Sequence, residues 1–170
     1  MEKINIYNIV RQGSDFFECR EKAVDICKAY AEAEYHTDRD WELMYDFCFR
    51  GMDADVHIPL WASECLGEKV LQNRTTLEVI EFYHKWGYEP EWIEGNPADY
   101  IGEQLKFTAY LIGAECENNC DRVDAVNEFM QNYLLTTLSV IFKSLKEYKE
   151  CYSTIIRFVG NLLSALSERI

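Results

Sequence analysis

The sequence predicts an all-helical, single-domain protein, and three observations lead to this prediction. Apolar residues recur at helical spacing through most of the chain, whereas alternating strand patterns and Asn-Gly or Asp-Gly hairpin turns are missing. All three prolines fall between residues 59 and 97, so helix breakers are confined to the middle of the chain. A length of 170 residues suits one domain. We expect one all-α bundle over residues 1–170, with about six or seven helices and an irregular central section over 52–75.

In the first part of the chain, apolar periodicity predicts two long helices. The first is expected to begin at Ser14 and to end near Tyr35, with a short helix before it that breaks near Gly13. The second is expected to begin after Asp38 and to stop at Gly51, since glycine is the usual residue after a helix end. This second run is apolar nearly all round, which places it in the core.

The helix after the irregular section is expected over Leu77–Trp86, with Thr75 or Thr76 as its N-cap and Gly87 at its end. Beyond a polar turn near 116–120, periodicity predicts a long helix over about 121–145 and a last helix over about 152–166.

The stretch 95–105 combines the end of a loop with the start of a helix. Asn96 suits an N-cap, because its side-chain oxygen can accept from free backbone N–H groups. Pro97 suits the first helical position, and Asp99 the third, where the helix dipole favours a carboxylate. We expect this helix to run to about Glu117.

The charge is strongly acidic, at −13, and unevenly distributed. Residues 121–170 carry six acidic and six basic side chains, so the whole excess lies in residues 1–120. Residues 89–103 contain acidic side chains and no Lys or Arg. Such a surface repels nucleic acid and attracts a basic partner. The chain has no apolar run long enough to span a membrane, and Met1-Glu2-Lys3 does not open a signal peptide, so a cytoplasmic location is expected.

Motifs for catalysis, cofactors or metals are missing. The seven cysteines include no CxxC pair, which disfavours a zinc ribbon, a thioredoxin-like site and an iron–sulfur cluster. The glycines form no phosphate-binding loop, and the three histidines belong to no HxxxH or HExxH pair. Ser63 has no GxSxG context. We expect a binding protein without metal or cofactor, and not an enzyme.

Three blocks, in order, resemble the TorD/DmsD/NarJ family of cytoplasmic chaperones for molybdenum-containing redox enzymes. The first is 45–51 (YDFCFRG) followed by 59–63 (PLWAS), and the second is 76–83 (TLEVIEFY) closed by 86–88 (WGY). The third is 96–100 (NPADY), which looks like the family's E-P-x-D-H signature. A weaker echo lies in 129–135 (FMQNYLL), where Tyr133 stands in place of a common histidine.

The resemblance implies an all-helical fold that binds the twin-arginine signal peptide, or a folding intermediate, of a molybdenum enzyme until cofactor insertion and export. The partner is then the leader or the catalytic subunit of that enzyme, and the chain is a monomer or a homodimer. Asp99 is kept from the signature, but Asn96 replaces its glutamate and Tyr100 its histidine. Tyrosine donates a hydrogen bond but does not titrate near neutral pH.

The candidate peptide-binding residues combine the signature with nearby aromatic side chains, which could stack on a guanidinium or hold apolar residues. They are Asp99, Tyr100, Asn96, Pro97, Glu103, Trp61, Ser63, Tyr83 and Trp86. Against this stands the simpler interpretation that Asp99 caps its helix and that Tyr83 and Trp86 are core residues. Two other functions stay open: a small-molecule protein that binds a guanine nucleotide or a pterin cofactor, and a helical scaffold that binds no leader peptide.

Overall fold

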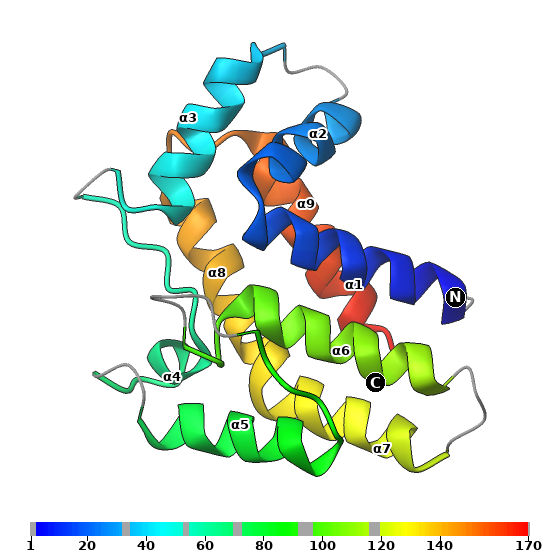
Figure 1. The fold of residues 1–170 in the computed structure, drawn as a ribbon. Coiled ribbons are helices and arrows are strands. Elements are labelled where there is room, and N and C mark those ends of the chain that lie inside the picture. The colour runs from blue at the N-terminus through cyan, green and yellow to red at the C-terminus, as the bar shows by residue number, and fades with distance from the viewer. Residues whose placement is uncertain are drawn as a thin grey trace.

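The structure is a computed structural model that describes residues 3–31, 35–52, 55–69, 73–91, 97–115 and 120–169 (Figure 1). Within these ranges the secondary structure is helical, and one isolated antiparallel bridge joins Trp61 to Tyr100. The elements are α1 (Lys3–Glu18), α2 (Arg20–Tyr30), α3 (Asp38–Phe49), α4 (Ala62–Cys65), α5 (Arg74–Lys85), α6 (Ile101–Glu115), α7 (Cys120–Phe129), a π-helical turn η1 (Met130–Leu134), α8 (Leu135–Glu147) and α9 (Ser153–Ser167).

Helix α6 lies at the centre of the bundle, packed against α1 on one side and α7 on the other (Figure 1). Helices α2 and α3 pack on each other at one end of the molecule, and α4 and α5 at the opposite end. Helices α8 and α9 pack together and connect these parts, because α8 contacts α4 and α9 contacts α1 and α2. The predicted all-α bundle is confirmed.

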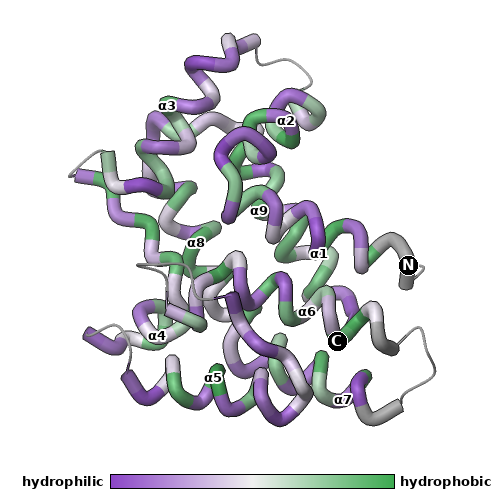
Figure 2. Tube along the Cα trace, viewed as in Figure 1, coloured by the Kyte–Doolittle hydropathy of each residue, from purple (hydrophilic) through white to green (hydrophobic). Residues whose placement is uncertain are grey.

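Aromatic side chains fill much of the core beside α6. Phe107 is fully buried, with its ring centroid 4.6 Å from that of Tyr83 and 4.8 Å from that of Phe129. Burying a side chain of this size contributes about 1.5–3 kcal/mol. Figure 2 shows hydrophobic and hydrophilic residues interspersed along the helices, as in amphipathic helices that bury one face.

The first helix boundary differs from its prediction. Helix α1 continues through Gly13 and Ser14, and the break falls at Cys19, which has an extended backbone. Gly13 serves close packing instead of ending a helix, since a Cβ there would lie 2.8 Å from Leu162 Cδ2. Ser14 is buried and caps nothing at this position, because it lies inside a continuous helix.

Helices α3 and α5 begin with side-chain caps. Thr37 and Asp40 form a reciprocal capping box at α3, close to the predicted start. At α5 the N-cap is Asn73, which accepts from the backbone N–H of Thr75. The predicted caps, Thr75 and Thr76, are therefore wrong: both are buried in the first turn, where the Thr76 hydroxyl bonds elsewhere. Gly87, with φ of 72°, follows this helix as expected.

The start of α6 also differs from its prediction. The helix begins at Ile101, not at Pro97, and residues 97–100 form a turn in which the Tyr100 N–H donates to the Pro97 carbonyl. The placement of Asp99 at a third helical position is thus wrong, because its side chain turns inward to bond other segments. The predicted cap Asn96 and the polar turn 116–119 lie outside the described residues.

The predicted long helix is present as α7, η1 and α8, with a π-helical turn inside it. Val126, Met130, Leu134 and Leu138 are all fully buried and lie four residues apart. In a regular α-helix, each step of four residues drifts by about 40° around the axis, so three steps drift by about 120°. A π-helical turn takes up one extra residue, or about 100°, and returns these side chains to the core.

Candidate functional site

Asp99 is the centre of a buried polar cluster before α6, with 0% of its surface exposed. One carboxylate oxygen accepts from the Ser63 backbone N–H at 2.9 Å, and the other from the Thr76 hydroxyl at 2.9 Å. Its backbone carbonyl accepts from the Ala62 N–H at 3.0 Å and from Gln104 Nε2 at 2.8 Å. Asp99 therefore joins α4, α5 and the start of α6.

These bonds hold two neighbouring segments side by side. The Ile101 N–H donates to the Leu60 carbonyl at 2.8 Å, next to the bridge between Trp61 and Tyr100. The rings of Trp61 and Tyr100 are tilted by 52° to each other, with centroids 6.2 Å apart. Asp99 thus acts as a positioning residue for aromatic side chains that it does not touch.

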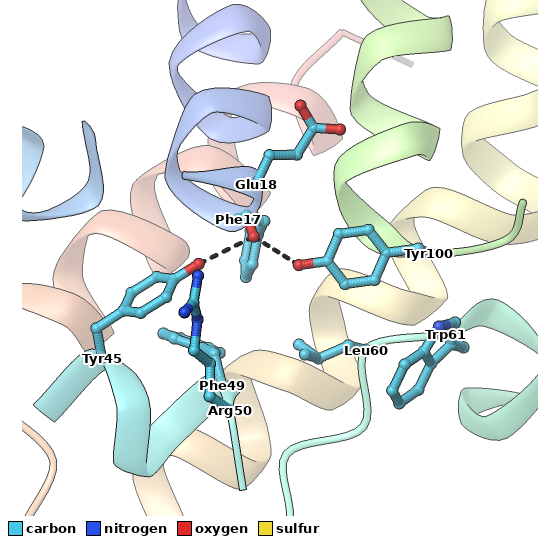
Figure 3. Close-up of a pocket in the computed structure, with 8 residues that line it drawn as sticks. All are labelled: Phe17, Glu18, Tyr45, Phe49, Arg50, Leu60, Trp61 and Tyr100. Carbon is cyan, nitrogen blue, oxygen red and sulfur yellow. Dashed lines mark hydrogen bonds between the residues drawn. The ribbon is translucent and has the colours of Figure 1, made fainter. Parts of the chain in front are cut away.

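Those aromatic side chains form one wall of a cavity of about 430 Å³, which we call the groove (Figure 3). Its other walls come from the end of α1 and the end of α3. The lining is mostly aromatic and apolar, with one carboxylate and one guanidinium: Phe17, Glu18, Tyr45, Phe49, Arg50, Leu60, Trp61 and Tyr100.

Two phenol groups meet in the groove at one acceptor. The hydroxyls of Tyr45 and Tyr100 both donate to the Phe17 carbonyl, at 2.9 and 2.5 Å, as Figure 3 shows. Burial raises the pKa of both phenols well above the usual value, so both stay protonated at neutral pH. They tie α3 and the turn before α6 to the end of α1, and they present ring surface to the groove.

A cation separates the groove from a second cavity. Lys106 contacts Glu18 at 2.8 Å, Glu91 at 2.7 Å and, more distantly, Glu103 at 3.8 Å. Burial lowers the pKa of Lys106, but its hydrogen bonds to Glu18 and Glu91 outweigh burial and raise it. Burial raises the pKa of Glu18, and the contact with Lys106 opposes this only in part. The Lys106 ammonium therefore already offsets part of the negative charge of Glu18.

The second cavity, which we call the flank cavity, has a volume of about 420 Å³ and lies along α1 and α6. Its lining is Tyr7, Arg11, Ser14, Asp15, Tyr88, Glu91, Lys106, Ala109 and Tyr110.

On its other side the groove continues into a third cavity of about 290 Å³, which shares Phe49, Arg50, Leu60 and Trp61 with it. Asp46 lies behind this wall, almost buried, and contacts Arg20 at 3.0 Å and Arg50 at 3.7 Å. The Arg50 guanidinium also lies over the Tyr45 ring, 5.9 Å from its centroid. The groove and the third cavity together offer an extended, mainly apolar channel.

Burial divides the residues predicted to bind a peptide into two groups. Trp61 and Tyr100 line the groove. Asp99, Ser63 and Tyr83 have no exposed surface, so they do not meet a ligand directly in this structure. Tyr83 is a core residue whose hydroxyl donates to the Ala98 carbonyl at 3.0 Å.

Three other predicted residues, Pro97, Glu103 and Trp86, do not line the groove. Pro97 is buried in the turn before α6, and Asn96 lies outside the described residues. Glu103 is 4% exposed and accepts from the Tyr88 hydroxyl at 2.6 Å. Trp86 follows α5, where its carbonyl accepts from the Tyr110 hydroxyl at 3.1 Å.

Six groove residues were not among the predicted ones, and all six come from outside the signature: Phe17, Glu18, Tyr45, Phe49, Arg50 and Leu60. Tyr45, Phe49 and Arg50 belong to a block that resembles the family, so that block carried a usable signal. Phe17 and Glu18 had no such signal, because only the break at Cys19 brings the end of α1 to this place.

The described residues include no group of three or more His, Cys, Asp and Glu side chains placed to hold a metal ion. Among the helices in those same ranges, none is long and apolar enough to cross a bilayer.

Comparison with known families gives one match. The chain is similar to the nitrate reductase delta subunit family over residues 17–138. No curated protein and no solved structure matches it significantly. Because the match covers well over half of its 170 residues, the chain belongs to this family of NarJ/TorD-type chaperones, which act in the maturation of molybdenum enzymes.

Proposed function

We propose that this chain is a maturation chaperone that binds the leader segment of a molybdenum enzyme in the groove until the cofactor has been inserted. The observation that carries the proposal is the aromatic groove at the signature turn, where Trp61 and Tyr100 meet Phe17 and Phe49. Family membership supplies the class of client, and the groove suggests which part of the client is held.

The groove suits the apolar part of a leader better than its charged part. Its volume of about 430 Å³ lies in the range typical of binding pockets, roughly 300–1,000 Å³. Each apolar side chain that a leader buries there would contribute about 1.5–3 kcal/mol. The Tyr45 and Tyr100 hydroxyls already bond Phe17, so the two phenols offer mainly their rings.

Paired arginines would instead be attracted by the protein's overall charge. The groove holds one carboxylate, Glu18, which already contacts Lys106, and one guanidinium, Arg50, which repels a cation. The net charge of −13 favours a basic segment over a wider area. We therefore expect the protein to distinguish arginine from lysine only weakly, and to bind a basic leader less tightly as the salt concentration rises.

Titration calorimetry with three peptides tests the proposal. The first peptide is a twin-arginine leader with its apolar segment, the second carries Lys-Lys, and the third keeps the arginines but has serine at the apolar positions. Serine should raise Kd about 30-fold or more, since at least one buried side chain is lost, whereas Lys-Lys should raise it no more than about threefold.

Equal binding of the apolar and serine peptides, or binding of neither, would contradict the proposal. GTP added at millimolar concentration serves as the control for the nucleotide alternative. It should leave the melting temperature unchanged, whereas a nucleotide-binding protein would be stabilised by it.

A further inference from the structure

A cluster of sulfur atoms lies behind the groove and is not used by the proposed function. Cys48, in the last turn of α3, and Cys151, in the turn between α8 and α9, have their Sγ atoms 3.8 Å apart. The Met44 sulfur is also 3.8 Å from Cys48 Sγ. Cys48 is 3% exposed and Cys151 is 9% exposed. Two thiols from segments 103 residues apart are thus in direct contact.

This geometry is close to that of a disulfide. An S–S bond is about 2.05 Å long, so the two sulfurs would need to approach each other by less than about 2 Å. Cys48 is held by a helix, whereas Cys151 belongs to a non-helical turn that can supply the movement. None of the cysteines with described side chains, Cys19, Cys27, Cys48, Cys65 and Cys151, forms a disulfide in this structure.

We propose that Cys48 and Cys151 are an oxidation site that hydrogen peroxide converts into a disulfide, and that this bond weakens ligand binding in the groove. The first half of this inference stands alone, and the second half rests on the proposed function.

The peroxide accepts the two electrons that the two thiols lose when the disulfide forms. Cys151 gives up its proton and attacks one peroxide oxygen, which breaks the O–O bond and forms a sulfenic acid with release of one water. The Cys48 sulfur then attacks the Cys151 sulfur, the S–S bond forms, and the second water leaves with the Cys48 proton. Two thiols lose two electrons in total, and one peroxide is reduced to two waters.

The order of the two steps follows from the surroundings of each thiol. A hydrogen bond with Cys151 and burial raise the pKa of Cys48, which disfavours Cys48 as the first nucleophile. Cys151 is the more exposed of the two, so the peroxide meets it first.

The bond would act on the groove through the end of α3. Cys48 lines the third cavity, and the next two residues, Phe49 and Arg50, line both that cavity and the groove. Phe49 packs on Phe17, with centroids 5.6 Å apart. The bond would tie the end of α3 to the Cys151 turn, so Phe49 and Arg50, which directly follow Cys48, would lose freedom to adjust to a ligand.

Mass spectrometry of the full chain after treatment with hydrogen peroxide tests the first half. We expect a loss of about 2 Da and a proteolytic fragment that links Cys48 to Cys151, reversed by dithiothreitol. Cys151→Ala and Cys48→Ala should each abolish this fragment. The matched control is Cys65→Ala, because Cys65 is half-buried beside the Pro59 carbonyl and should leave the fragment unchanged.

Sulfinic or sulfonic acid on unlinked Cys48 and Cys151, or a different cysteine pair in the linked fragment, would overturn the inference. The second half is measured by titrating the reduced and the oxidised chain with the twin-arginine leader peptide. Oxidation should raise Kd about fivefold or more, and Cys151→Ala should remove this difference.

If the chain with a verified Cys48–Cys151 disulfide binds the peptide with an unchanged Kd, the proposed effect on the groove is wrong. If the reduced chain does not bind the peptide, the proposed function fails, and the linked fragment still decides the thiol chemistry.

Discussion

The groove and the flank cavity have nearly equal volumes, about 430 and 420 Å³, yet their walls differ in chemistry. The groove is lined mainly by aromatic and apolar side chains from four separate segments, and Asp99 helps to align two of them, Leu60–Trp61 and Tyr100. The flank cavity lies along two packed helices and carries two cations and two carboxylates: Arg11, Lys106, Asp15 and Glu91. Volume alone would not distinguish them.

The groove wall that carries Trp61 and Tyr100 is held in place by the buried polar cluster around Asp99. Turning Asp99 inward costs the helix start a carboxylate that the dipole would favour, but it fixes Leu60, Trp61 and Tyr100 in one wall. The flank cavity has its own nearly buried carboxylate, Glu103, which accepts from the Tyr88 hydroxyl and the Glu91 N–H, but its wall also carries exposed ion pairs such as Asp15 with Lys22.

The largest effect is expected from Asp99→Asn. An amide can keep its oxygen toward the Ser63 N–H and turn its NH2 group to the Thr76 hydroxyl oxygen, but both bonds lose the carboxylate charge, which makes such a bond worth about 1.5–3 kcal/mol instead of about 0.5–1.5 kcal/mol. We expect a loss of about 3 kcal/mol in the free energy of unfolding, measured with urea, together with weaker leader-peptide binding.

The same substitution in the flank cavity, Asp15→Asn, is the control and should cost less than about 1 kcal/mol, because its ion pair with Lys22 is exposed. If the two variants lose equal stability, Asp99 is not the anchor of the groove.

A second comparison replaces one aromatic side chain in each cavity. Trp61→Ala should raise the leader-peptide Kd about 30-fold, since the indole is a wall of the groove and a large apolar contact is lost. Tyr110→Ala in the flank cavity should change Kd less than about twofold. Calorimetric titration measures both, and a larger loss with Tyr110→Ala would move the binding site to the flank cavity.

Tyr100→His tests what the missing family histidine would add. Tyr100 itself stays protonated at neutral pH, because burial raises its pKa, so binding should not depend on it between pH 5.5 and 8 or so. In the variant, imidazolium forms below about pH 6.5 and repels a basic leader, and Kd should rise several-fold at low pH. Tyr7→His, in the flank cavity, should show no such change in a titration series across pH.

The smallest effects are expected for Glu18 and Glu91, the two carboxylates that both contact Lys106. The folded state raises the pKa of Glu18 above its usual 4.5, mainly by burial, so this group costs stability as the pH rises through that window. The folded state lowers the pKa of Glu91, by its contact with Lys106, so Glu91 adds stability above pH 4.5 that is lost as the pH falls.

Glu18→Gln should therefore raise the melting temperature slightly at pH 7, and Glu91→Gln should lower it slightly. Thermal unfolding from pH 4 to pH 8 measures both variants. If both variants shift the melting temperature in the same direction, the opposite effects that we expect from the pKa changes of Glu18 and Glu91 are contradicted.

Much of the fold followed from local sequence patterns, but the groove did not. Periodicity predicted the helices because most helices bury one face. Gly87 follows α5 as predicted, because glycine adopts the positive φ of that position without strain. The α6 start failed because Asp99 has long-range partners, Ser63 and Thr76, that outweigh its local preference for a helix N-terminus. Glu18 lines the groove because α1 breaks at Cys19, and no capping residue in the sequence predicts this break.

The π-helical turn at Met130–Leu134 has a consequence for how this helix can change in length. It takes up one extra residue, or about 100° of rotation, between the two halves of the helix. Deleting one residue there would let an ordinary α-helix form, with the apolar stripes of α7 and α8 still facing the same way. The turn therefore keeps the half packed on α6 and the half packed on α9 in the same rotational phase, and it is a place where this helix can absorb the loss of one residue.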